Sequence, residues 1–192
     1  MASLPVLMIH TLAVSAYGYQ LMCKVQQQNL QLRELSQQDS LTGLQSRRHW
    51  EDQARALLAT QAAMGRSASL MLIDVDRFKD INDRLGHMHG DDVLRALAGV
   101  IREQLPPGSH PGRLGGDEFA VALPLAAAES QRVAERIRRG VEAIDCSVSI
   151  GIAPMPAVAE LRAWMDAADR ALYQAKAGGR NRVQASAEPA PA

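Results

Sequence analysis

The sequence predicts an α/β or α+β domain in which helices cover a central sheet. Amphipathic segments with helical spacing alternate along the chain with short apolar runs of strand length. Two of these runs, within residues 112–124, are joined by a glycine-containing turn that is typical of a hairpin. The chain has 192 residues, 47% of them hydrophobic, which is enough for one well-buried domain with an N-terminal appendage.

The N-terminal segment, residues 4–23, contains no Asp, Glu, Lys or Arg over about the length that a helix needs to cross a bilayer. Lys24 follows at once and no basic residue precedes the run, so the positive-inside rule would leave the rest of the chain in the cytoplasm. We expect residues 1–23 to form a transmembrane or anchoring helix in the inner, cytoplasmic membrane. A packed N-terminal helix and a fragment of a longer sensor are the alternatives.

Residues 24–38 are polar and rich in Gln, with no Gly or Pro, and this composition predicts a helical stalk. Apolar residues keep heptad spacing for barely more than one heptad, so a coiled coil and a single solvated helix both stay open. We expect the globular domain at residues 39–184. The small, Pro-containing residues 185–192 predict a disordered tail.

The first half of the domain contains two predicted helices around one predicted strand. Residues 46–63 carry apolar residues at helical spacing, with Ser46 at the N-cap position. Residues 68–76 form a short apolar run that ends in acids, as a core strand does when it opens onto a site. Residues 91–104 show helical spacing again, and the Pro-Pro-Gly sequence at 106–108 ends that helix.

The second half begins with the hairpin at residues 112–124. A helix is expected at residues 126–139, a strand at residues 146–153 and a final helix at residues 157–177. Basic and acidic residues number 21 each, so the net charge does not suggest a nucleic-acid-binding protein. Any site that depends on charge must therefore be local.

Two acidic clusters stand at the ends of predicted strands. Asp74 and Asp76 end the first strand, and Asp117 and Glu118 lie in the hairpin turn. If the strands pair, the carboxylates converge and repel one another unless a cation neutralises them. Mg²⁺ meets this need, and it usually completes its coordination with water and substrate phosphates; Mn²⁺ is the alternative ion. Solvated acids at strand ends are the structural alternative.

The segment after the first cluster could bind a nucleotide. Phe78 and Lys79 stand near a predicted helix start, where backbone N–H groups can hold phosphate oxygens. Asn82 and Asp91 supply an amide and a carboxylate, which suit the acceptors and donors of a guanine edge. An ordinary capping role for Asn82 and Asp91 is the alternative.

Two cations near the C-terminus form a third set. Lys176 and Arg180 lie four residues apart around a glycine pair and could contact a triphosphate, to which Arg can bind in a bidentate manner. The same two charges would also complement the dipole of the preceding helix without any ligand.

Taken together, these motifs resemble those of the GGDEF-domain diguanylate cyclases, enzymes that condense two GTP molecules to cyclic di-GMP. The likeness covers residues 39–183. The matching stretches, in the family order, are DSLTGLQSRRHW, DVDRFKDINDRLGHMHGDDVL, RLGGDEF, SVSIGIA and LYQAKAGGRN. The resemblance implies a palm-like α/β domain with a central, mainly antiparallel five-stranded sheet, preceded by a long N-terminal helix.

The resemblance also implies roles for individual residues. Mg²⁺ would be held by Asp74, the Val75 carbonyl and Asp117, with Glu118 beside them as a further metal or proton-accepting group. The sequence does not decide whether Asp117 or Glu118 accepts the proton of the 3′-hydroxyl. The substrate-binding residues would be Asn82 and Asp91 for guanine, Phe78 and Lys79 for phosphates near the helix start, and Lys176 and Arg180 for the β- and γ-phosphates.

One domain would hold one GTP, so the resemblance implies that activity requires a homodimer. A catalytically silent GTP-binding or scaffold protein with the same fold is the rival interpretation. Family members under product inhibition carry R-x-x-D shortly before the signature, whereas Pro106 to Ser109 read PPGS here. We therefore predict that a primary inhibitory site of that type is missing.

Overall fold

The computed structural model describes residues 17–22, 24, 37–144 and 146–186. The chain divides into two compact units, residues 1–36 and residues 37–192. In the first unit the described residues are helical. Across all the described residues, no helix is long and apolar enough to cross a membrane. Most of the predicted membrane segment and of the stalk lies outside the described residues, so both stay predictions.

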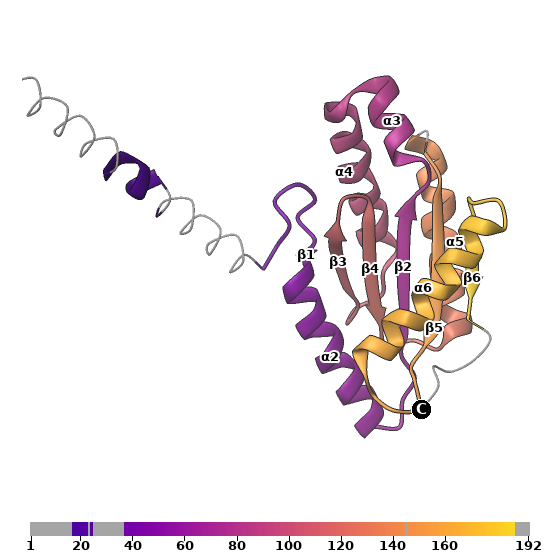
Figure 1. Cartoon of the computed structure of the whole chain (residues 1–192). Coiled ribbons are helices and arrows are strands. Elements are labelled where there is room, and N and C mark those ends of the chain that lie inside the picture. The colour runs from indigo at the N-terminus through magenta and orange to yellow at the C-terminus, as the bar shows by residue number, and fades with distance from the viewer. Residues whose placement is uncertain (1–16, 23, 25–36, 145, 187–192) are drawn as a thin grey trace, which may run out of the picture. The chain divides into compact units, whose positions relative to one another are not determined.

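The second unit alternates helices and strands as the sequence predicts (Figure 1). Its elements are β1 (Gln45–Ser46), α2 (Arg47–Ala63), β2 (Ser69–Val75), α3 (Phe78–Leu85), α4 (His87–Gln104), β3 (His110–Gly115), β4 (Glu118–Leu123), α5 (Ala127–Gly140), the 3₁₀ helix η1 (Val141–Ile144), β5 (Val148–Pro154), α6 (Leu161–Ala177) and β6 (Val183–Ala185).

The sheet has six strands in the order β1-β3-β4-β2-β5-β6, so the expectation of five strands is wrong. The four inner strands pair antiparallel, whereas β1 and β6 add to the two edges in parallel. These edge strands have two and three residues. Strands so short carry no alternation of apolar and polar residues, and the sequence pattern therefore could not reveal them.

Several element boundaries differ from the sequence predictions. Helix α4 begins at His87, four residues early, because Gly86 has φ +86° and separates it sharply from α3. Helix α6 begins late, at Leu161, after an extended Glu160. The sheet continues to Ala185, one residue past the expected domain end, and the Ser186 N–H donates to the Ile152 carbonyl at 2.7 Å. Residues 187–192 of the predicted tail lie outside the described residues.

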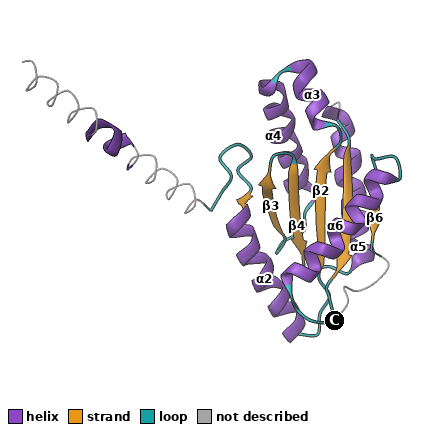
Figure 2. Ribbon diagram, in the orientation of Figure 1, coloured by secondary structure: helices purple, strands orange, loops and turns teal. Residues whose placement is uncertain are grey.

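Helices flank the sheet (Figure 2), and two hydrophobic cores form on its opposite faces. Helices α4 and α5 cover the face that carries Ile73, Phe119 and Val121. Helices α2 and α6 cover the face that carries Leu70, Leu72 and Ala120. In each core a layer of helices packs on the sheet, which is the arrangement that the alternation of helices and strands in the sequence predicts.

Each of the two tryptophans fixes a helix to the sheet. Trp50 of α2 is fully buried and donates its indole N–H to the His110 carbonyl at 3.0 Å. Trp164 of α6 is also fully buried and donates to the Ala153 carbonyl at 3.1 Å. Because a buried indole N–H is costly without a partner, these bonds specify where α2 and α6 dock.

Candidate active site

The acidic clusters of the sequence meet at one end of the β2–β4 pair. Asp74 lies directly opposite Glu118 in the antiparallel register. The Val75 N–H donates to the Asp117 carbonyl at 3.4 Å, which places the hairpin turn beside the end of β2. Paired residues in a sheet point to the same face, so the Asp74 and Glu118 side chains share one side.

Asp74 is more buried than Asp117 and Glu118, with only 8% of its surface exposed. Its Oδ2 forms an ion pair with Lys176 Nζ of α6 at a distance of 2.8 Å. Burial raises the pKa of the Asp74 carboxyl above its ordinary value, Lys176 opposes this rise, and the charges of Asp117 and Glu118 add to it. The carboxylates of Asp117 and Glu118 therefore repel that of Asp74, as expected at a site that binds a cation.

The donor set fits Mg²⁺ if the substrate completes the coordination. Among the described residues, no group of three or more His, Cys, Asp or Glu side chains could hold a metal ion. Mg²⁺ does not require one, because it commonly binds one or two carboxylates together with phosphates and water. Asp74 and Asp117 supply carboxylates beside the backbone of Val75, and the charges of Asp117 and Glu118 add to burial in raising the pKa of Asp74.

Asn82 and Asp91, the predicted guanine-binding residues, lie on the adjacent helices α3 and α4. The side-chain oxygen of Asn82 is buried and has no hydrogen-bond partner. Gly90 lies directly against it, and a methyl group at Gly90 would overlap with that oxygen. A buried polar atom without a partner is unusual in a native structure, and a donor group on a ligand could satisfy it.

The predicted phosphate-binding residues flank the end of β2. Phe78 is the first residue of α3, and the exposed Lys79 follows it. Arg77, just before the helix, has a left-handed conformation with φ 54° and provides no side-chain cap, so it leaves the first helical N–H groups without that partner. Arg180 is exposed in the turn after α6, also left-handed with φ 61°.

Asp76 does not act with the other acids, although the sequence places it among them. Its Oδ2 accepts hydrogen bonds from the Ser147 hydroxyl at 2.7 Å and from the Asn181 N–H at 2.9 Å. Its Oδ1 accepts one from the Ser149 hydroxyl at 2.6 Å. The spacing of Ser147 and Ser149, two residues apart on one face of a strand, was the only sequence signal for this arrangement.

Sequence reasoning also missed the contacts that hold the hairpin tip. Arg113 donates to the Gly116 carbonyl at 2.7 Å and pairs with Asp39 Oδ1 at 3.1 Å. Asp39 also accepts the Thr42 N–H at 2.9 Å. Burial alone would raise the pKa of Asp39, but the hydrogen bonds from Thr42 and Arg113 and the Arg113 charge bring it below its ordinary value. The turn before β1 is thereby tied to the signature hairpin.

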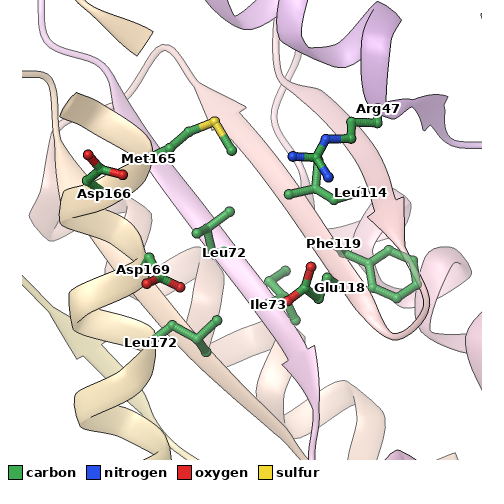
Figure 3. A pocket seen from close by; sticks show the side chains of 10 residues that line it. All are labelled: Arg47, Leu72, Ile73, Leu114, Glu118, Phe119, Met165, Asp166, Asp169 and Leu172. Carbon is green, nitrogen blue, oxygen red and sulfur yellow. The ribbon is translucent and has the colours of Figure 1, made fainter. Parts of the chain in front are cut away.

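A cavity of about 210 Å³ lies between α2 and α6 (Figure 3). Its floor is apolar, and Arg47, Asp166 and Asp169 contribute charged groups to its lining. Glu118 is the only predicted site residue that lines it. The cavity therefore adjoins the acidic cluster and is separate from the Asn82 and Asp91 pair.

The fold and this site define an α/β domain in which an acidic hairpin lies beside a buried Asp74–Lys176 ion pair at one end of the sheet. Residues 36–182 match the family model described as "Diguanylate cyclase, GGDEF domain". The chain belongs to the GGDEF domain family.

Two curated relatives illustrate the similarity. The "Probable diguanylate cyclase DgcC" of Escherichia coli (strain K12) is 36% identical over 195 residues, which cover 96% of this chain and 53% of the relative. The "Response regulator PleD" of Caulobacter vibrioides is 39% identical over 163 residues, which cover 78% of this chain and 36% of the relative. The chain thus spans about half or less of the length of these relatives.

Solved structures show the same fold. The coiled coil and GGDEF domain of DgcB from Caulobacter crescentus, in complex with c-di-GMP, aligns with a TM-score of 0.74 and 31% identity, covering 90% of this chain and 97% of that one. Diguanylate cyclase SiaD from Pseudomonas aeruginosa, in complex with its activator SiaC, aligns with a TM-score of 0.75 and 30% identity, covering 94% and 73%.

Proposed function

We propose that this chain is an active diguanylate cyclase, which condenses two GTP molecules into cyclic di-GMP and releases two pyrophosphates. The observation that carries the proposal is the buried Asp74 carboxylate, with Glu118 opposite it and Asp117 and Lys176 close by. Family membership supports the same reaction. A silent scaffold would gain nothing from keeping a buried acid whose ionisation the surroundings oppose.

The substrate would be GTP, with the roles divided among four parts of the chain. Asn82 and Asp91 would bind the guanine edge, because adenine lacks the matching pair of donors. The start of α3, with Phe78 and Lys79, would hold phosphate oxygens. Lys176 and Arg180 would contact the β- and γ-phosphates.

Asp74, Asp117 and the Val75 carbonyl would hold Mg²⁺, or Mn²⁺ in its place, with Glu118 as a further ligand or proton acceptor. The bound ion would lower the pKa of the 3′-hydroxyl and neutralise charge on the reacting phosphates. The protein's own contribution is positioning, because Asp74 is fixed by β2 and the hairpin turn by its pairing with that strand.

Each condensation forms one bond and breaks one. The 3′-oxygen of one GTP attacks the α-phosphorus of the other, the hydroxyl proton passes to Asp117 or Glu118, and the bond to the β-phosphate breaks to release pyrophosphate. Two such steps close the ring. Because one domain binds one GTP in this scheme, two domains must face each other, and we propose a homodimer as the active form.

The test is to incubate the purified chain with GTP and Mg²⁺ and to separate cyclic di-GMP and pyrophosphate by chromatography. Asp117→Ala should abolish turnover, because the side chain lies in a half-buried turn and serves the metal. Its unfolding temperature should stay close to that of the wild type. If a demonstrably dimeric wild type released neither product, the scaffold interpretation would replace this one; normal turnover by Asp117→Ala would refute the metal assignment.

The location of the chain is a separate proposal. Residues 4–23 would anchor it to the inner membrane and leave the catalytic domain in the cytoplasm. Fractionation followed by a carbonate wash tests this, since an inserted helix stays with the membrane and a peripheral protein is released.

A further inference from the structure

Asp76 stands next to the proposed metal-binding residues, but the protein itself engages both of its carboxylate oxygens. Asp76 is buried, with 7% of its surface exposed. The three hydrogen bonds from Ser147, Ser149 and the Asn181 N–H engage both carboxylate oxygens. These donors fix the orientation of the carboxylate, as expected for a group with a structural role.

The contact with Asn181 reaches a strained turn. Gly179, Arg180 and Asn181 all have positive φ, of 112°, 61° and 44°. Left-handed residues other than glycine are unfavourable and persist only where the surroundings impose them. Here the surroundings supply the Asp76 carboxylate on the Asn181 N–H and an Arg138 guanidinium on the Asn181 side-chain oxygen at 2.9 Å.

The strained turn carries a proposed phosphate ligand at its centre. Arg180 lies immediately before the residue that Asp76 holds, and its own N–H donates to the Ala175 carbonyl at 3.1 Å. Lys176, one turn earlier, contacts Asp74. The end of α6 is therefore docked on the end of β2 by two neighbouring carboxylates, Asp74 through Lys176 and Asp76 through Asn181.

We propose that Asp76 is a positioning residue that sets Arg180 at a fixed place relative to the metal-binding end of β2, so that one GTP triphosphate can span both. This inference rests on the proposed function, because it assigns the triphosphate of GTP as the ligand of that turn. Asp76 itself touches neither metal nor nucleotide. Its role is to link two segments that lie far apart in the sequence.

The experiment compares Asp76→Asn with Ser149→Ala in the full chain. Asp76→Asn weakens the hydrogen bond that the Asn181 N–H donates to residue 76. Ser149→Ala removes a different hydrogen bond to Asp76 and leaves the one from Asn181 in place. Asp76→Asn should raise KM for GTP about tenfold, roughly the effect of one charge-assisted phosphate contact, with kcat within about twofold. Ser149→Ala should lower the unfolding temperature without changing KM.

A double-mutant cycle with Arg180→Ala tests the route of the effect. In the Arg180→Ala background, Asp76→Asn should change KM by less than about twofold, because the cation that it positions is gone. Equal effects in both backgrounds would overturn the proposal. So would recovery of Asp76→Asn by raised Mg²⁺, which would make Asp76 a metal ligand, or an equal rise in KM for Ser149→Ala.

Two further measurements keep the test independent of turnover. Hydrogen exchange at residues 178–183 should become faster in Asp76→Asn and stay unchanged in Ser149→Ala. If Asp76→Asn does not fold, Asn181→Ala loosens the same turn from the other side and should raise KM alike. If the wild type makes no cyclic di-GMP, the proposed function fails, and calorimetric GTP binding with the same variants still decides whether Asp76 positions Arg180.

Discussion

At the scale of single residues, Asp74 is where function and stability oppose each other. Its pKa is raised in the folded protein, so the native state binds this proton more tightly than the unfolded chain does. The stabilising contribution is complete below the ordinary carboxyl pKa and is lost as the pH rises through the raised native value. At neutral pH without metal, the ionised Asp74 therefore lowers the free energy of unfolding.

We accordingly predict that Asp74→Asn raises the unfolding temperature at pH 7 in EDTA. The rise should be about 2–4 °C for each kcal/mol that the substitution adds to the free energy of unfolding. The advantage should shrink as the pH falls through the raised native pKa toward the ordinary carboxyl value, because the wild-type carboxyl becomes protonated. Mg²⁺ with GTP should stabilise the wild type and not the variant. Calorimetry in both buffers measures these shifts, and a variant less stable than the wild type in EDTA at pH 7 would contradict the prediction.

Gly90 provides a second residue-scale prediction. A methyl group there would overlap with the Asn82 side-chain oxygen, so Gly90→Ala should displace the proposed guanine-binding amide and raise KM for GTP at least about tenfold. Ala is the better helix former, so stability should fall little. The measurement is KM from initial rates of pyrophosphate release.

Gly99→Ala is the matched control, because Gly99 lies in the same helix and has open space around its Cα. It should stabilise the protein by up to about 1 kcal/mol and leave KM unchanged. A KM that responds equally to both substitutions would show that the clash with Asn82 is not the cause.

Single residues also show the limit of sequence reasoning. Asp74 and Asp117 were predictable as neighbours because both end strands of one expected pairing. Asp76 has the same residue type and a similar position, yet its partners are Ser147 just before β5, Ser149 within β5 and the turn after α6. These partners depend on the docking of distant segments, which local patterns do not encode.

At the scale of elements, α6 brings the cations to the site because it lies unusually close to β5. The approach occurs at Gly151, where a methyl group would overlap with the Leu172 N–H nitrogen and the Ala168 carbonyl oxygen. Both are backbone atoms of α6, which cannot move without the whole helix. The glycine in the SVSIGIA stretch is therefore a packing requirement that indirectly places Lys176.

Gly151→Ala should destabilise the domain by about 1–3 kcal/mol or more, because the helix must lift from the strand to make room. Chemical denaturation measures this loss. Turnover should also fall under conditions where the variant is still folded, since Lys176 and Arg180 move with α6. Stability equal to that of the wild type would mean that α6 does not pack as closely as the structure has it.

The central elements were the predictable part of the fold. β2, β4 and β5 are continuous buried strands, and the apolar stripes of α2 and α4 match their buried residues. The edges were not predictable, because β1 and β6 owe their existence to pairing with β3 and β5 and to no propensity of their own.

At the scale of the whole molecule, the proposed reaction needs two chains, and this requirement can be separated from every effect within one chain. If each domain activates the 3′-hydroxyl of its own GTP, a dimer of one wild-type and one Asp117→Ala chain can form the first bond and not the second. It should therefore release one pyrophosphate and a linear dinucleotide that still carries a triphosphate.

Mixing wild type with Asp117→Ala under conditions of subunit exchange should reduce cyclic di-GMP with the square of the wild-type fraction, to about one quarter at equal amounts. The linear product should be greatest at that ratio. Chromatography of both products across a mixing series gives the answer, with buffer in place of the variant as the dilution control. A decline in proportion to the wild-type fraction, with no linear product, would mean that each chain completes the reaction without help from its partner's Asp117.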